Sequence, residues 1–174
     1  MFKKVLSVFL FFAVAAFLLT GSSSCSMFKK NSRTRVKALM IGSNTFEARL
    51  LCELAQYRNK QPVMLYDASR ASFYYLSGST AAEPVALDQL NDFVKYLNPR
   101  QILVLGGNEH VPAEYVKQLA GAYPVMTIQS DDWYKNAQQL AEVLNLNRLP
   151  REFKDTRDRY IKSGLLKAEQ LNGK

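Results

Sequence analysis

Residues 85–107 read VALDQLNDFVKYLNPRQILVLGG, and this stretch indicates the fold class. Apolar residues at 87, 90, 93, 94 and 97 follow helical spacing, and Asn98-Pro99 ends that helix. The run Gln101–Leu105 is a short, continuously apolar strand, and Gly106-Gly107 follows it directly. A helix that leads within a few residues into an unbroken apolar strand is typical of parallel strands covered on both faces.

The same alternation continues to both sides of this stretch. We expect strands at 36–41, 62–66, 101–105 and 124–128, and helices at 46–59, 85–97, 112–120 and 131–146. Residues 68–84 show no clear period, and Pro84 with the Ser, Gly and Thr residues before it predicts a loop. The sequence therefore predicts an α/β fold, in which a small parallel sheet carries helices on both faces.

Composition and charge exclude several classes of protein. The chain has 174 residues, of which 48% are hydrophobic and 22% charged, and it has two cysteines, so disorder and a disulfide framework are not expected. The net charge of +8 is uneven: residues 26–37 hold five basic and no acidic side chains, whereas residues 38–147 hold eight basic and eleven acidic ones. A nucleic-acid-binding domain carries its basic patch on the folded body, so this class is excluded.

The first 24 residues have the pattern of a secretory signal peptide. Lys3 and Lys4 precede an uncharged run of 15 residues, Val5–Leu19, and small residues follow it. This run is short for a spanning helix, which needs about 20 residues, although an uncleaved N-terminal membrane helix stays an alternative.

The end of that segment, Ser23-Ser24-Cys25, resembles the lipobox of bacterial lipoproteins. The resemblance implies that Cys25 is diacylated and becomes the new N-terminus, which anchors the protein to a membrane of the bacterial cell envelope with its body outside the cytoplasm. An unmodified thiol after ordinary cleavage is the alternative. Cys52 lies in an apolar stretch of a predicted helix, and we interpret it as a packing residue.

Four segments follow from these observations. They are a lipoprotein signal peptide (1–24), a basic linker after the lipidated cysteine (25–35), an α/β domain (36–147) and a basic, helical C-terminal tail (148–174). The linker charges favour contact with anionic headgroups, and an extended solvated spacer is the alternative. The tail has Phe153, Tyr160, Ile161 and Leu165 on one side, where it docks on the body or on a neighbouring molecule.

Residues 36–146 resemble the cell wall-binding repeat 2 family. Gln61-Pro62-Val63-Met64-Leu65 is similar to the Ala-Pro-Ile-Leu-Leu strand of that family, and Asn98–Gly107 is similar to its Pro–strand–Gly-Gly segment. Pro112–Val116 and Tyr134–Ala141 resemble the segments that follow.

This resemblance implies a Toprim-like or flavodoxin-like three-layer sandwich that binds anionic cell-wall polymers non-covalently. In the family the Ile-Leu-Leu strand is implicated in binding, which corresponds here to Val63, Met64 and Leu65. Family modules pack in threes, and this chain has a single copy, so we expect a homo-oligomer, most plausibly a trimer. A monomer whose tail shields the open faces is the alternative.

Loops at the carboxyl ends of parallel strands are where ligands bind in such folds. The candidate ligand-binding residues there are Ser43, Asn44, Asp67, Gly106, Gly107 and Asn108. The two glycines expose backbone N–H groups to an anion, or else form a tight turn that requires positive φ.

Other chemistry finds less support. His110 is interpreted as an exposed loop residue without a catalytic partner, and the positions of the Toprim acidic metal ligands hold Gly42-Ser43 and Gly106-Gly107. No catalytic residue, metal site or cofactor is therefore assigned. A minor hypothesis is that carbohydrate rings stack on four aromatic residues: Trp133, Tyr134, Tyr74 and Tyr75.

The sequence thus predicts a lipid-anchored envelope protein with a non-catalytic α/β module that binds a cell-wall or surface polymer or a protein partner. The alternative is a small-molecule-binding or hydrolytic protein with its site at the carboxyl ends of the strands.

Overall fold

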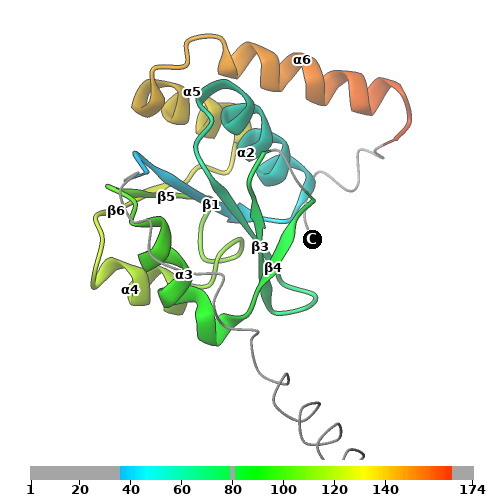
Figure 1. Ribbon diagram of the computed structural model, residues 1–174. Coiled ribbons are helices and arrows are strands. Elements are labelled where there is room, and N and C mark those ends of the chain that lie inside the picture. Colours follow the sequence, from blue (N-terminus) through cyan, green and yellow to red (C-terminus); the bar gives the residue numbers. More distant parts are fainter. Residues whose placement is uncertain (1–35, 79–80, 166–174) are drawn as a thin grey trace, which may run out of the picture. The chain divides into compact units, whose positions relative to one another are not determined.

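The computed structural model describes residues 36–78 and 81–165. A six-stranded sheet carries helices on both faces, which confirms the three-layer α/β sandwich (Figure 1). The strands are β1 (Leu39–Ser43), β2 (Val63–Asp67), β3 (Ser72–Leu76), β4 (Glu83–Val85), β5 (Ile102–Leu105) and β6 (Val125–Ile128). The helices are α2 (Phe46–Asn59), the 3-10 turn η1 (Leu87–Gln89), α3 (Leu90–Leu97), α4 (Ala113–Ala120), α5 (Trp133–Leu144) and α6 (Leu149–Lys162).

The strand order is β4-β3-β2-β1-β5-β6. Strands β2, β1, β5 and β6 are parallel, and the chain moves from β1 to β2 on one side before it crosses to β5 on the other. The order of the connections therefore reverses between β1 and β5, as in the flavodoxin-like arrangement. In folds of this kind, ligands bind outside the carboxyl ends of the strands at the point where the order reverses.

The predicted loop at 68–84 is wrong, because this segment contains β3 and β4. Asp67 accepts hydrogen bonds from the backbone N–H and hydroxyl of Ser69, and Ala71 takes a φ of 46°, so the chain turns back along β2. The aromatic run in β3 favours a strand, and Phe73 is buried. The sheet is therefore mixed, with an antiparallel hairpin at one edge, and Pro84 lies in the outermost strand, where proline is tolerated.

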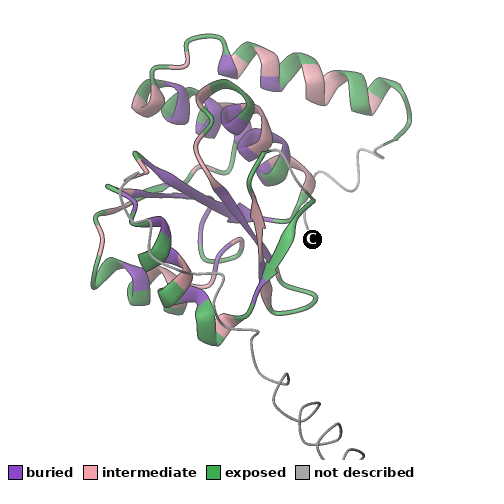
Figure 2. Cartoon of the chain, in the orientation of Figure 1, coloured by how far each residue is buried: buried purple, intermediate pink, exposed green. Residues whose placement is uncertain are grey.

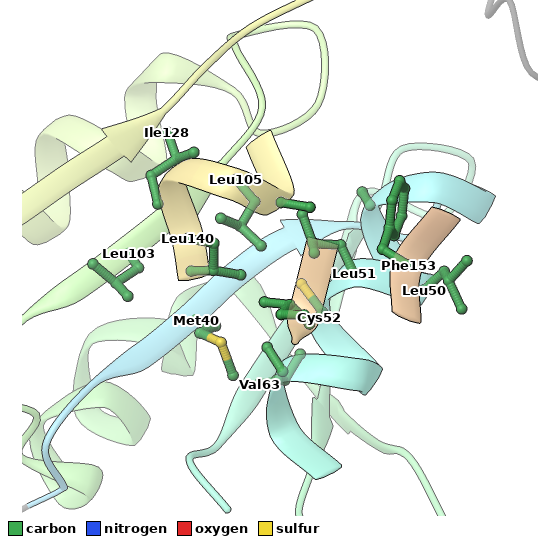
Figure 3. Close-up of a cluster of buried hydrophobic side chains, with 14 of the residues drawn as sticks. Met40, Leu50, Leu51, Cys52, Val63, Leu103, Leu105, Ile128, Leu140 and Phe153 are labelled. Carbon is green, nitrogen blue, oxygen red and sulfur yellow. The ribbon is translucent and has the colours of Figure 1, made fainter. Parts of the chain in front are cut away.

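Both faces of the central strands are buried (Figure 2). On one face, Met40, Val63 and Leu103 pack against Leu51 of α2 and Leu140 of α5 (Figure 3). The side chains of the second cluster come from the opposite face of the strands, from α3 and from α4: they include Ile41, Met64, Phe73, Val94 and Leu119. Continuous apolar strands are thus covered on both sides, as predicted.

Helix α6 lies across α2 and α5 (Figure 1) and shares their core. Leu149 and Phe153 are completely buried, and the ring of Tyr160 meets that of Phe46 edge-on at a centroid distance of 5.3 Å. Arg58 of α2 pairs with Glu152, its Nε donating to Oε2 at 2.9 Å. The sequence placed a boundary at 148, but the packing continues across it, and the rest of the tail, 166–174, lies outside the described residues.

Cys52 is a core residue, as the sequence predicted. It is buried on α2 among the apolar side chains of the first cluster, and this burial raises the pKa of its thiol. A Cβ at Gly42 of β1 would lie 3.0 Å from its Sγ atom, so the helix approaches the strand closely at this point. The thiol is therefore unreactive in the folded protein.

Within the described residues, no helix combines the length and the apolar character that crossing a membrane requires. The predicted signal peptide and the linker, residues 1–35, lie outside those residues.

We expect Phe153→Ala to lower the free energy of unfolding by about 3–5 kcal/mol, because it leaves a cavity between α6 and the core. Leu165→Ala, at an exposed position just after α6, is the control and should change that free energy by less than about 0.5 kcal/mol. Urea denaturation of the full chain measures both values. Equal midpoints for the two variants would show that α6 contributes nothing to the fold.

Candidate functional site

The loops after β1 and β5 form the candidate site, because the order of connections reverses between these strands. Ser43 is the last residue of β1 and Asn44 follows it, and the loop after β5 contains Gly106, Gly107 and Asn108. These two groups of predicted residues therefore lie on neighbouring strand ends. The structure brings a further residue, His110, into the same place.

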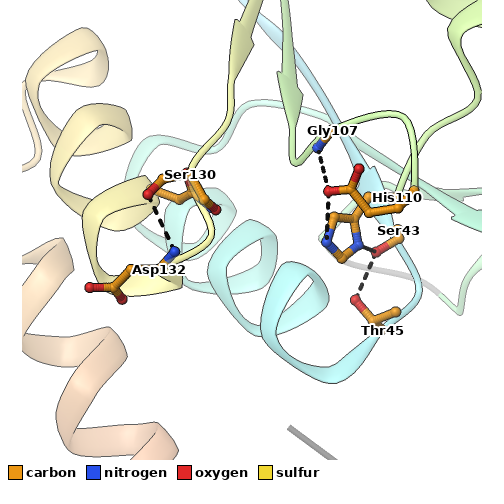
Figure 4. Close-up of polar contacts among 8 residues, drawn as sticks. Ser43, Thr45, Gly107, His110, Ser130 and Asp132 are labelled. Atoms are coloured by element: carbon orange, nitrogen blue, oxygen red, sulfur yellow. Dashed lines mark hydrogen bonds and ion pairs between the residues drawn. The ribbon is translucent and has the colours of Figure 1, made fainter. Parts of the chain in front are cut away.

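A chain of polar side chains joins the two loops (Figure 4). The Oγ atom of Ser43 lies 3.0 Å from Nδ1 of His110 and 2.7 Å from Oγ1 of Thr45. Ser43 is buried, whereas Thr45, at the start of α2, is exposed. The hydroxyls thus connect a half-buried imidazole with the surface.

The prediction that His110 is an exposed loop residue is wrong. Only 20% of its side chain is exposed, and its ring meets that of Trp133 edge-on at 5.0 Å. The turn from Gly107, closed by the N–H of His110 donating to the Gly107 carbonyl at 2.9 Å, folds the ring back over Gly106. Ser43 and His110 are 67 residues apart, and no local pattern in the sequence announces their contact.

Only glycine fits at position 106. It takes a φ of 92°, and a Cβ there would lie 2.5 Å from Cδ2 of His110. The backbone conformation and the imidazole together require a residue without a side chain. The double glycine therefore forms a tight turn, one of the two alternatives for this motif, and makes room for the ring.

The backbone N–H of Gly107, which we considered as an anion-binding group, already donates a hydrogen bond to the carboxylate of Glu109. Oε1 of Glu109 accepts from the N–H of Gly107 at 3.2 Å and lies 3.6 Å from Nε2 of His110. A Cβ at Gly107 would collide with this carboxylate and with the side chain of Gln129. In the free protein the Gly107 amide is thus already satisfied.

Burial lowers the pKa of His110, and the nearby charge of Glu109 opposes this shift only in part. The imidazole is therefore neutral at pH 7. We assign its hydrogen to Nε2, which faces the carboxylate, so that Nδ1 accepts a hydrogen bond from the hydroxyl of Ser43.

The end of β6 and the start of α5 form a third side of this edge. The side chain of Asp132 caps α5 by accepting from the N–H of Tyr134 at 2.8 Å. Asn136 is fully buried and donates to the carbonyl of Ser130 at 3.0 Å. Its Oδ1 has no hydrogen-bond partner among the described residues.

Three of the predicted ligand-binding residues are core residues instead. Val63, Met64 and Leu65 are buried in β2, with exposed fractions of at most 2%, so their side chains offer no surface to a ligand. Asp67 is partly exposed, but its hydrogen bonds to Ser69 serve the turn into β3 and lower the pKa of its carboxyl.

The aromatic residues proposed as carbohydrate platforms have structural contacts. Trp133 is buried against His110, and Tyr75 meets Phe93 edge-on at 5.0 Å. The hydroxyl of Tyr74 accepts from Nη1 of Arg70 at 2.9 Å. Tyr134, in the first turn of α5, is half-buried.

A groove between α2 and α6 is a competing site. Its volume is about 270 Å³, slightly below the range of roughly 300–1,000 Å³ that is typical of ligand pockets. Arg58 and Glu152, which line it, already pair with each other. The reversal of strand order, and not a cavity volume, places the candidate site at the ends of β1 and β5.

No three His, Cys, Asp or Glu side chains come together as a metal-binding group in residues 36–78 and 81–165. Comparison with known proteins found no matching family model, no similar curated protein and no similar solved structure. The resemblance to the cell wall-binding repeat 2 family therefore stays a hypothesis.

We expect part of the stability of this protein to depend on His110. Its pKa is lower in the folded state than in the unfolded state, so the unfolded chain binds a proton more strongly, and stability falls as the pH drops below about 6.5. His110→Gln should remove this component, which would appear as a pH-dependent difference in unfolding free energy between the two proteins between pH 8 and 5. If the difference in unfolding free energy between the two proteins stays constant from pH 8 to pH 5, the imidazole of His110 is not buried in its neutral form.

Proposed function

We propose that this chain is a lipid-anchored protein of the bacterial cell envelope whose α/β body is a non-catalytic binding module. Its site is the crevice between β1 and β5. The observation that supports this most directly is the hydrogen-bonded chain from Thr45 through Ser43 to His110, which ties the two strand-end loops together. Loops fixed in this way present a pre-formed surface, which lowers the entropic cost of binding.

The polar groups at this edge suit a ligand rich in hydroxyl or amino groups, such as a cell-wall or surface glycan. Asn44 and Asn108 are exposed on the two loops, and an amide both donates and accepts hydrogen bonds. Glu109, Asp131 and Asp132 are also exposed there and disfavour a polyanion. The ligand we propose is therefore an uncharged or amino-bearing polymer, and a protein partner is the other possible outcome of the binding test.

The absence of catalysis is part of the proposal and rests on access. Ser43 is 4% exposed, so a substrate does not reach its hydroxyl. A hydrolytic site is the second candidate, and one observation favours it: the exposed hydroxyl of Thr45 is linked through Ser43 to a neutral imidazole, which is a possible base.

The anchor and the envelope location rest on the sequence of residues 1–25, with its basic start, apolar run and small residues before Cys25. Association into a trimer is a further proposal that light scattering tests. Helix α6 already covers α2 and α5 within one chain, which favours the monomeric alternative for that face.

Cys25→Ala should release the protein from the membrane fraction or leave an unprocessed precursor, because acylation at this thiol is the anchor that we propose. Ser26→Ala is the matched control and should be processed and retained as the unmodified chain is. Fractionation of expressing bacteria followed by immunoblotting reports both properties. Normal processing and retention of Cys25→Ala would refute the lipid anchor.

Binding at the crevice predicts that the full chain sediments with purified peptidoglycan or surface polysaccharide. The double variant Asn44→Ala/Asn108→Ala should lose this co-sedimentation, because it removes the exposed amides on both loops. The control Gln138→Ala/Asn147→Ala removes two exposed amides elsewhere and should bind normally.

Three results of that assay would count against the proposal. Equal loss in both double variants would place binding outside the crevice, and absence of binding to either polymer would favour a protein partner. If the chain releases soluble fragments from either polymer and His110→Gln does not, the protein is a hydrolase and the binding proposal is wrong.

A further inference from the structure

Charged residues at the ends of three helices are sorted to opposite edges of the sheet. Helices α2, α3 and α4 all run back from the carboxyl ends of the strands to their amino ends. Each has an acid in its first turn and a base in its last turn, which complements the helix dipole. The acids are Glu47, Asp92 and Glu114, and the bases are Arg58, Lys95 and Lys117.

The loops at the amino edge of the sheet add to this polarity. Lys37, Lys60 and Arg100 lie in these loops, and residues 36–38, 59–62, 98–101 and 121–124 contain no acid. Backbone contacts hold the loops side by side: the N–H of Arg100 donates to the carbonyl of Val36 at 2.9 Å, and that of Ala38 donates to Oε1 of Gln61 at 3.1 Å.

Five of these bases define what we call the basic edge: Lys37, Lys60, Lys95, Arg100 and Lys117. All five are exposed, and none forms an ion pair within the part of the chain that the structure describes. Among the described residues, three acids lie at this edge: Glu152 pairs with Arg58, Glu142 lies in the last turn of α5, and Glu83 begins the outermost strand, β4. The Nζ atom of Lys60 lies 4.7 Å from the ring centroid of Tyr57, which is 70% exposed, and exposed tyrosines are favoured at membrane interfaces.

The chain enters the body at this same edge. Eleven residues lead from Cys25 to Val36 and reach at most about 40 Å when fully extended. Four of them are basic and none is acidic: Lys29, Lys30, Arg33 and Arg35. A lipid at Cys25 would thus hold the basic edge within reach of the headgroups.

We propose that the basic edge lies against anionic lipid headgroups and turns the crevice between β1 and β5 away from the membrane. This inference rests on the lipid anchor of the proposed function. Electrostatic attraction of exposed bases by anionic lipids supplies the force, and the acidic side chains at the opposite edge are repelled. The parallel strands then point away from the bilayer, and the site faces the rest of the envelope.

The test uses the full, acylated chain reconstituted into vesicles of phosphatidylcholine, or of phosphatidylcholine and phosphatidylglycerol in a ratio of two to one. A fluorophore is attached at Ala122→Cys on the amino edge or at Asn108→Cys on the carboxyl edge, both exposed positions, and buried Cys52 stays unlabelled. Energy transfer to an acceptor on the lipid headgroups reports the distance of each edge. We expect the ratio of transfer at 122 to transfer at 108 to rise with phosphatidylglycerol and to fall again at high salt.

Two charge variants distinguish the effect of the basic edge from the effect of the protein's net charge. The triple variant Lys37→Glu/Lys60→Glu/Arg100→Glu should lose the rise caused by phosphatidylglycerol. Its control, Lys135→Glu/Arg159→Glu/Lys162→Glu, changes the charge by the same amount at exposed positions near the start of α5 and the end of α6, away from that edge, and should keep it.

An unchanged ratio in the two vesicles, or the same loss in both triple variants, would overturn the orientation while the anchor stands. A chain that is not retained on either vesicle would overturn the anchor, and the orientation with it.

Discussion

Burial of β1 on both faces is the constraint from which the rest of the structure follows. All five residues of this strand are buried, and parallel strands pair with it on each side. Neither face of such a strand can meet water, so helices must cover both. Each helix then has to return from the carboxyl to the amino end of the sheet, which fixes the direction of α2, α3 and α4 and therefore the distribution of charge at their ends.

The same constraint produces the candidate site. Because β2 and β5 lie on opposite sides of β1, the connections that leave β1 and β5 diverge at the carboxyl ends of these strands. The Ser43–His110 hydrogen bond joins these two segments, which are distant in sequence. Gly106 permits it, since the imidazole occupies the position that a Cβ would need.

The sequence predicted those features that local patterns carry. The bounds of α2 match the prediction, and the four parallel strands lie within three residues of their expected positions, because apolar period and turn residues determine both. The hairpin of β3 and β4 was missed, since its Phe and Tyr residues become a strand only by pairing with β2.

The site was predicted only in part. The position of the loops follows from the parallel sheet, but the contact of His110 with Ser43 depends on packing across 67 residues. Val63, Met64 and Leu65 show the opposite error: the apolar character that identifies β2 as a strand is also what places these side chains in the core, away from any ligand. Likewise, the helical pattern of α6 was visible, whereas its place over α2 and α5 was one of two possibilities.

The carboxylate of Glu109, which accepts a hydrogen bond from the Gly107 amide, competes with any anionic ligand for that donor. Glu109 is separated from that amide by a single residue, so its effective concentration there is high. An incoming carboxylate or phosphate gains this donor only by displacing a group of the same charge from a short tether. A neutral hydroxyl can instead bind beside the carboxylate and donate to it. The loop after β5 therefore favours neutral ligands over anionic ones before any ligand has bound.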